Sequence, residues 1–148
     1  MSFDLALNRG DISIGVDGDL RKIRNTSKVA QDVLKVLHTP IGSNPLTPNI
    51  GSEVTTLNIG VNVNEQFAES RVEASILKSL EAVQAIQKAQ ARQQEVTPEE
   101  TILNLSEVTA ARDSKDPRQY NITITVITGG LTEVVIEPFT VQTQIIGE

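Results

Sequence analysis

The feature that most constrains this chain is the stretch from residue 62 to residue 94, which contains neither Gly nor Pro. Ala, Glu, Gln, Lys and Leu dominate it, and all five favour helix. Its apolar residues recur at helical spacing: Val72, Ile76, Leu80, Val83 and Ile86. The sequence predicts a long helix from a capping box at Asn62 and Glu65 to about Gln94. Its polar end, from Gln87 onward, is expected to face solvent or a partner.

A second amphipathic helix is predicted upstream. Residues 25–27 (Asn-Thr-Ser) favour a helix N-cap, and the apolar stripe that follows comprises Val29, Ala30, Val33, Val36 and Leu37. Pro40 ends this helix near His38, because proline disfavours helical geometry in the residue before it. Residues 39–54 are rich in Pro, Gly, Ser and Asn and predict a loop. A loop of this length is uncommon unless it has a function or is disordered.

Alternating apolar residues predict β-structure at both ends of the chain. Near the N-terminus, strands are expected at residues 4–7, 12–16 and 20–23, with turns between them. After the long helix we expect an extended segment at 102–111, a strand at 119–128 and a return strand at 131–146. The last one contains Pro138, which is typical of an edge strand or a bulge.

Together these elements predict a single α+β domain over residues 1–148. Two main helices should pack on a small, mostly antiparallel sheet. A β-hairpin is expected at the N-terminus and another at the C-terminus. With no Trp, one Tyr and three Phe, the core must be largely aliphatic.

Composition argues against several classes of partner. The net charge is −6 and the only dense basic run is 21–24 (Arg-Lys-Ile-Arg), so nucleic acid is not expected as a ligand. The chain has no Cys, which excludes disulfides and thiolate metal sites and fits assembly in a reducing cytoplasm. We find no signal peptide and no apolar run long enough to span a membrane.

Residues that usually carry catalysis are scarce. His38 is the only histidine, so a Ser-His-Asp triad is not convincing, and no glycine-rich loop has phosphate-binding form. Glu65, Glu69 and Glu73 share one helical face at i, i+4 spacing, which is typical of a solvated surface rather than of a sugar-cleaving pair. We therefore expect no enzymatic activity, no cofactor and no metal.

Two windows resemble a known family. In the first, residues 18–51, a glycine-led hairpin precedes the first helix, which ends in Leu37-His38-Thr39, and Pro48-Asn49-Ile50-Gly51 follows. In the second, residues 111–146, the triplet Asp116-Pro117-Arg118 stands just before a strand–turn–strand hairpin. These features are similar to the baseplate wedge and sheath-initiator family of contractile phage tails, which is related to the baseplate subunit of type VI secretion systems. The chain departs from the family pattern in having Asp116 where Glu is usual and Ser43 where an acidic residue is common.

The resemblance implies a structural protein of the virion baseplate, assembled in the host cytoplasm and present in several copies. Its implied partners are the tail sheath protein and other wedge proteins, with the tail tube or hub as a further option. The triplet would contact neighbouring wedge subunits, and a sheet edge would template the first sheath ring by strand exchange. The partner-binding residues predicted on this basis are Asp116, Pro117, Arg118, Ile122, Ile124, Val134, Ile136 and Val141.

Other interpretations stay open at this point. Residues 120–131 and 141–147 carry no charge, which fits either an edge strand that accepts another chain or a strand at the centre of its own sheet. The triplet could pair with a partner's carboxylate or form only a weak local ion pair on a surface turn. An intracellular protein-binding adaptor is the alternative function. A muramidase-like hydrolase is the enzymatic one, but we find no residues that support it.

Overall fold

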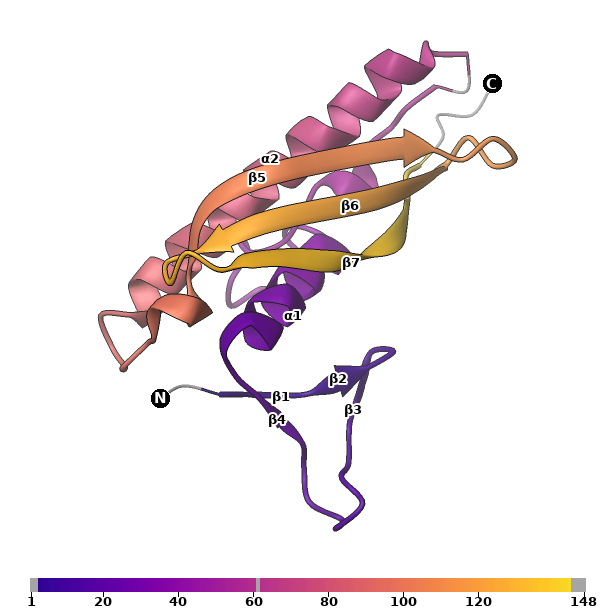
Figure 1. Cartoon of the computed structure of the whole chain (residues 1–148). Helices are drawn as coiled ribbons and strands as arrows, with labels where there is room; N and C mark the ends of the chain where they lie inside the picture. The colour runs from indigo at the N-terminus through magenta and orange to yellow at the C-terminus, as the bar shows by residue number, and fades with distance from the viewer. Residues whose placement is uncertain (1–2, 61, 145–148) are drawn as a thin grey trace.

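The chain is an α+β protein, as the sequence predicts (Figure 1). The structure, a computed structural model, describes residues 3–60 and 62–144, with Glu137 described by its backbone alone. The predicted end of the last strand, 145–146, lies outside these residues. The helices are α1 (Asn25–His38) and α2 (Glu65–Gln90), with short 3-10 turns η1 (Val54–Thr56) and η2 (Pro98–Glu100). The strands are β1 (Asp4–Leu5), β2 (Leu7–Asn8), β3 (Asp11–Ile12), β4 (Lys22–Ile23), β5 (Ile102–Arg112), β6 (Gln119–Thr128) and β7 (Glu133–Gln142).

The main sheet is formed by the last three strands, in the order β5-β6-β7, and every pairing in it is antiparallel. Strand β6 is therefore central. For the uncharged residues in β6 the central position is confirmed, whereas residues 141–142 of the second uncharged stretch belong to β7, which is an edge strand of the sheet. Neighbouring strands on both sides satisfy the backbone of β6, which explains why it needs no charged residue to keep other chains away.

The two helices lie on one face of this sheet, and α2 runs along β5 (Figure 1). Aliphatic side chains from both helices and the sheet meet in one core, as the sparse aromatic content requires. Its fully enclosed members include Val33 and Leu37 of α1, Val72 and Ile76 of α2, and Tyr120, Ile122 and Ile124 of β6. The predicted apolar stripes of both helices thus face the sheet.

Helix α1 ends at His38, as Pro40 predicts, but its N-cap differs from the prediction. Arg24 is the N-cap and makes no side-chain capping bond, while Asn25 is already the first residue of the helix. Ile23 pairs with Asp4, so the helix begins almost directly after a paired strand residue. Residues 25–27 therefore form the first turn of the helix and do not precede it as a cap.

Helix α2 starts later and ends earlier than predicted. The side chain of Asn64, not Asn62, caps it by accepting a hydrogen bond from the backbone N–H of Phe67 at 3.4 Å. Glu65 is the first helical residue, so it cannot close the predicted capping box. The helix ends at Gln90, and Gln87, expected on a polar solvated end, is buried.

The N-terminal segment contains the predicted β-hairpin, formed by β2 and β3, together with two further pairings. Its strands meet at a junction in which three residues bond in a cycle: Ala6 N–H donates to the Arg21 carbonyl (2.8 Å), Arg21 N–H to Ser13 (3.0 Å) and Ser13 N–H to Ala6 (2.8 Å). Three short arms leave this junction: β1 with β4, β2 with β3, and a loop closed by the Ile14–Leu20 bridge. We call residues 3–24 the N-terminal ribbon. It projects away from the main sheet (Figure 1).

Candidate functional site

The two outer edges of the main sheet differ. On β5, backbone N–H groups donate to side chains of α2: Ile102 to Gln87 (2.8 Å), Ala110 to Glu73 (3.1 Å) and Arg112 to Glu69 (2.9 Å). The amide of Gln84 also approaches the carbonyl of Ile102, at 3.3 Å. These side chains occupy positions where a further strand would bond. Helix α2 therefore closes both ends of the β5 edge.

This arrangement corrects the prediction that Glu69 and Glu73 form a solvated helix face. Both carboxylates are half-buried and accept backbone hydrogen bonds. Helical spacing placed the two residues on one face correctly, but it could not show that this face lies against the edge of a strand. Both carboxylates bind backbone N–H groups at the outer edge of β5.

The β7 edge is open: among the described residues, no strand pairs with β7 on the side away from β6. Its hydrogen-bond alternation shows which backbone groups face that side. Thr128 N–H donates to Thr132 at 2.9 Å near the hairpin turn, and Thr143 N–H donates to Arg118 at 2.9 Å at the other end. In an antiparallel ladder, every second pair of residues is hydrogen-bonded. The backbone N–H and C=O groups of the residues between these pairs point away from the partner strand. The outward-facing residues are Glu133, Val135, Thr140 and Gln142.

Pro138 interrupts this edge, as the sequence predicts. The register shifts between Ile122 and Ile124 of β6, where β7 accommodates an extra residue. Such a bulge beside a proline divides the open edge into two short stretches. Just beyond β7 the edge is closed again, because Gln144 pairs with the segment around Asn58. The open stretch is thus bounded by the hairpin turn and by this pairing.

Five of the predicted partner-binding residues have buried side chains: Ile122, Ile124, Val134, Ile136 and Val141. They face the helices and hold the sheet on the core. The structure does not bring these side chains to the surface, so a partner at β7 would meet its backbone and its outward side chains instead. Alternation along the strand separates these two sets of residues.

The triplet Asp116-Pro117-Arg118 forms a surface turn between β5 and β6. Arg118 makes two contacts with the carboxylate of Asp116, Nε to Oδ1 at 3.1 Å and Nη2 to Oδ2 at 3.2 Å. The Arg118 hydrogen bonds lower the pKa of the Asp116 carboxyl. The pair is local, as in the second interpretation of this motif. Since the Arg118 carbonyl accepts from Thr143, the turn lies at the C-terminal end of β7.

No protein-family model matches the chain, and no curated protein matches it. The candidate site therefore rests on geometry and on the motifs described above.

The other chemical features of the described residues are modest. His38, the last residue of α1, is exposed; its Nδ1 is 2.9 Å from the Leu34 carbonyl, and its ring contacts that of Phe139 in β7. Within residues 3–60 and 62–144, no three His, Asp or Glu side chains gather in a way that could hold a metal ion. In the same residues, no helix combines the length and apolarity that crossing a membrane requires.

Proposed function

We propose that this chain is a non-enzymatic structural component of a contractile tail baseplate, located in the virion. It joins wedge subunits and templates the first ring of the tail sheath by accepting a strand at the open edge of β7. Two independent features support this proposal. One is the resemblance carried by residues 18–51 and 111–146. The other is the contrast between the two sheet edges.

The contrast between the edges is the observation that carries the proposal. A three-stranded sheet offers two sides for strand addition, and α2 occupies much of one of them. Addition at β7 would satisfy outward backbone groups that have no neighbouring strand within the described residues. The triplet turn lies near the C-terminal end of β7, on the side of β6, so a wedge subunit bound at this turn would be a neighbour of a sheath strand added at β7.

Substitutions at Val135 test the proposal directly. Its backbone faces the open edge and its side chain is 60% exposed, so little core packing is at stake. Val135→Pro removes the outward N–H, whereas Val135→Ala keeps it and removes only side-chain atoms. The purified variants are mixed with the sheath protein encoded near this chain, and sheath assembly is imaged by electron microscopy.

We expect Val135→Ala to seed sheath rings like the wild type and Val135→Pro to lose seeding. Circular dichroism must show that both variants keep the fold. If sheath polymerises equally well without this chain, or if folded Val135→Pro seeds normally, strand addition at β7 is wrong.

A further inference from the structure

The N-terminal ribbon carries a one-sided apolar surface that the proposed function does not use. Residues that face each other across an antiparallel pair project to the same face, and so do residues i and i+2 of one strand. The pairs around the junction are Leu5 with Lys22, Leu7 with Ile12, and Ile14 with Leu20. All six side chains therefore lie on one face, which we call the apolar face of the ribbon. The opposite face carries Ala6, Ser13 and Arg21.

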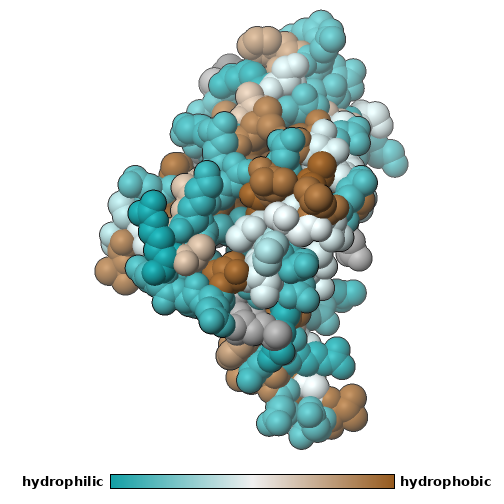
Figure 2. Space-filling view, turned by 60° about the vertical axis from the view of Figure 1, so that its left-hand side comes forward, coloured by the Kyte–Doolittle hydropathy of each residue, from teal (hydrophilic) through white to brown (hydrophobic). Residues whose placement is uncertain are grey.

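The protein itself leaves most of this face uncovered, with only Leu5 half-buried. None of residues 3–24 is buried, and Ile14 and Leu20 are 63% and 50% exposed. Hydrophobic surface is visible on the corresponding protrusion at the bottom of Figure 2. A small β-ribbon without a core is marginally stable in water, and clustered exposed apolar side chains usually mark an interaction surface. The cyclic hydrogen bonds of the junction connect the backbone segments that carry the six side chains.

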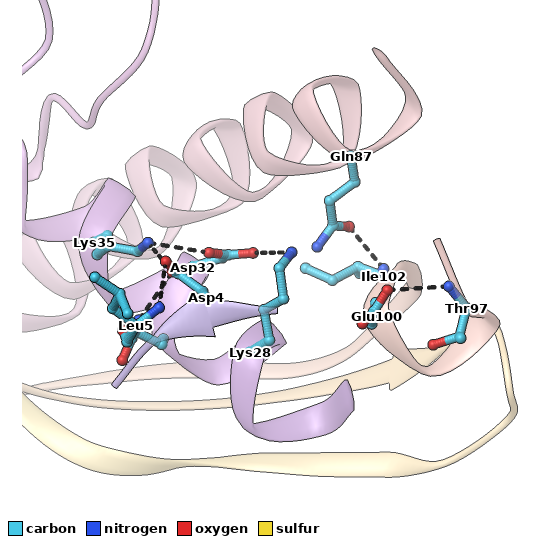
Figure 3. Close-up of polar contacts among 10 residues, drawn as sticks. Asp4, Leu5, Lys28, Asp32, Lys35, Gln87, Thr97, Glu100 and Ile102 are labelled. Carbon is cyan, nitrogen blue, oxygen red and sulfur yellow. Dashed lines mark hydrogen bonds and ion pairs between the residues drawn. The ribbon is translucent and has the colours of Figure 1, made fainter. Parts of the chain in front are cut away.

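Polar contacts attach the ribbon to α1 without covering the apolar face. Gln31 accepts from Leu7 N–H at 2.8 Å and donates to the Leu5 carbonyl at 2.8 Å, so it binds the edge of the strand and not its face. Lys35 pairs with Asp4 and with Asp32 (Figure 3). Helix α1 therefore holds the ribbon through polar contacts that do not involve the side chains of the apolar face.

The charge on the apolar face indicates what covers it. Among these six residues Lys22 alone is charged; its ammonium lies 4.4 Å from the centre of the Phe3 ring, and it takes part in none of the ion pairs found among the described residues. A second copy docked face to face would bring another Lys22 and no carboxylate. A partner that supplies a carboxylate in an apolar surrounding would satisfy this charge.

We propose that the apolar face of the N-terminal ribbon docks a segment of a different protein, with aliphatic side chains on one side and an Asp or Glu opposite Lys22. This surface is separate from the β7 edge. The inference goes beyond the proposed function, because it concerns a second partner and does not depend on strand addition.

Neighbouring positions on opposite faces provide a matched test. A photoreactive benzoylphenylalanine is placed at position 20, on the apolar face, or at position 21, on the opposite face. The full chain is produced together with the genes that neighbour its own, and cross-linked peptides are sequenced by mass spectrometry. We expect position 20 to capture one other protein, at a segment that combines aliphatic residues with Asp or Glu, and position 21 not to capture it.

Charge reversal then tests the role assigned to Lys22. Lys22→Glu should lower the cross-linking yield from position 20 about tenfold, whereas Lys22→Arg should preserve it. Replacing the partner's acidic residue by Lys should restore the yield of the Lys22→Glu variant. Thermal unfolding monitored by circular dichroism checks that the variants remain folded. The proposal is overturned by cross-links to a second copy, equal capture from both positions, absence of capture, a captured segment without an acid, or indifference to Lys22→Glu. Val135→Pro should leave this cross-link intact, which separates a failure here from a failure at β7.

Discussion

The carboxylate of Glu69 accepts a hydrogen bond of 2.9 Å from the backbone N–H of Arg112. A helix side chain thus binds a strand-edge group that would otherwise be available to another chain. Arg112 also extends its guanidinium toward the Pro117 carbonyl, at 2.8 Å, which ties the triplet turn to the end of β5. The closed edge and the candidate partner site are therefore connected through one residue.

Removing a side chain of α2 that accepts a hydrogen bond from β5 should make the β5 edge accessible to other chains. In Glu73→Ala, the N–H of Ala110 loses its partner, and we expect the free energy of unfolding to fall by about 1–3 kcal/mol. Self-association should also increase, because an open edge can pair with another chain. Urea unfolding and analytical ultracentrifugation measure the two effects. Glu73→Gln retains an acceptor and serves as the control; equal behaviour of Glu73→Ala and the wild type would contradict the role of α2.

The hydroxyl of Tyr120 is buried without a hydrogen-bond partner among the described residues. Burial also raises the pKa of this hydroxyl. Because an unsatisfied buried group costs free energy, Tyr120→Phe should leave the protein as stable as the wild type or more stable by about 1 kcal/mol. Thermal unfolding by calorimetry checks this. A clear loss of stability would mean that the hydroxyl has a partner.

Acid should loosen the N-terminal ribbon before it affects the core. Partial burial favours a higher pKa for Asp4, but the hydrogen bond and charge of Lys35 outweigh it and lower the pKa below the usual 3.8. The stabilisation is therefore present above the unfolded-state pKa and is lost as pH falls through the lower folded-state pKa. Amide exchange followed by NMR should show protection of the ribbon decreasing below about pH 4. Asp4→Asn should remove this dependence, and its persistence would point to another group.

The proposed function predicts that Arg118→Ala weakens the joining of wedge subunits while the chain itself stays folded. The side chain is exposed and its ion pair with Asp116 lies within the turn, so the urea midpoint should not change measurably. Co-purification with neighbouring wedge proteins measures the assembly effect. Arg118→Lys keeps the charge but loses the bidentate geometry, and we expect it to be intermediate. Normal co-assembly of Arg118→Ala would remove the triplet from the proposed function.

Local patterns in the sequence predicted much of the fold. The alternation in residues 119–128 matches β6 at both ends, and Pro40 correctly places the end of α1 at His38. Pro138 correctly marks a bulged edge strand. These features depend on the conformational preferences of neighbouring residues and on a repeat of two or 3.6 residues, so the sequence contains them directly.

The location of the candidate site depends on tertiary structure. Sequence alone left the position of 119–128 open, because pairing with β5 and β7 joins residues that are distant along the chain. It also could not show that Glu69 and Glu73 bind the β5 edge across about 40 residues of sequence, or that Ile122 and Ile124 face the core. Local propensity determined which segments are helix or strand. Long-range packing determined which sheet edge remained free and which apolar residues remained exposed.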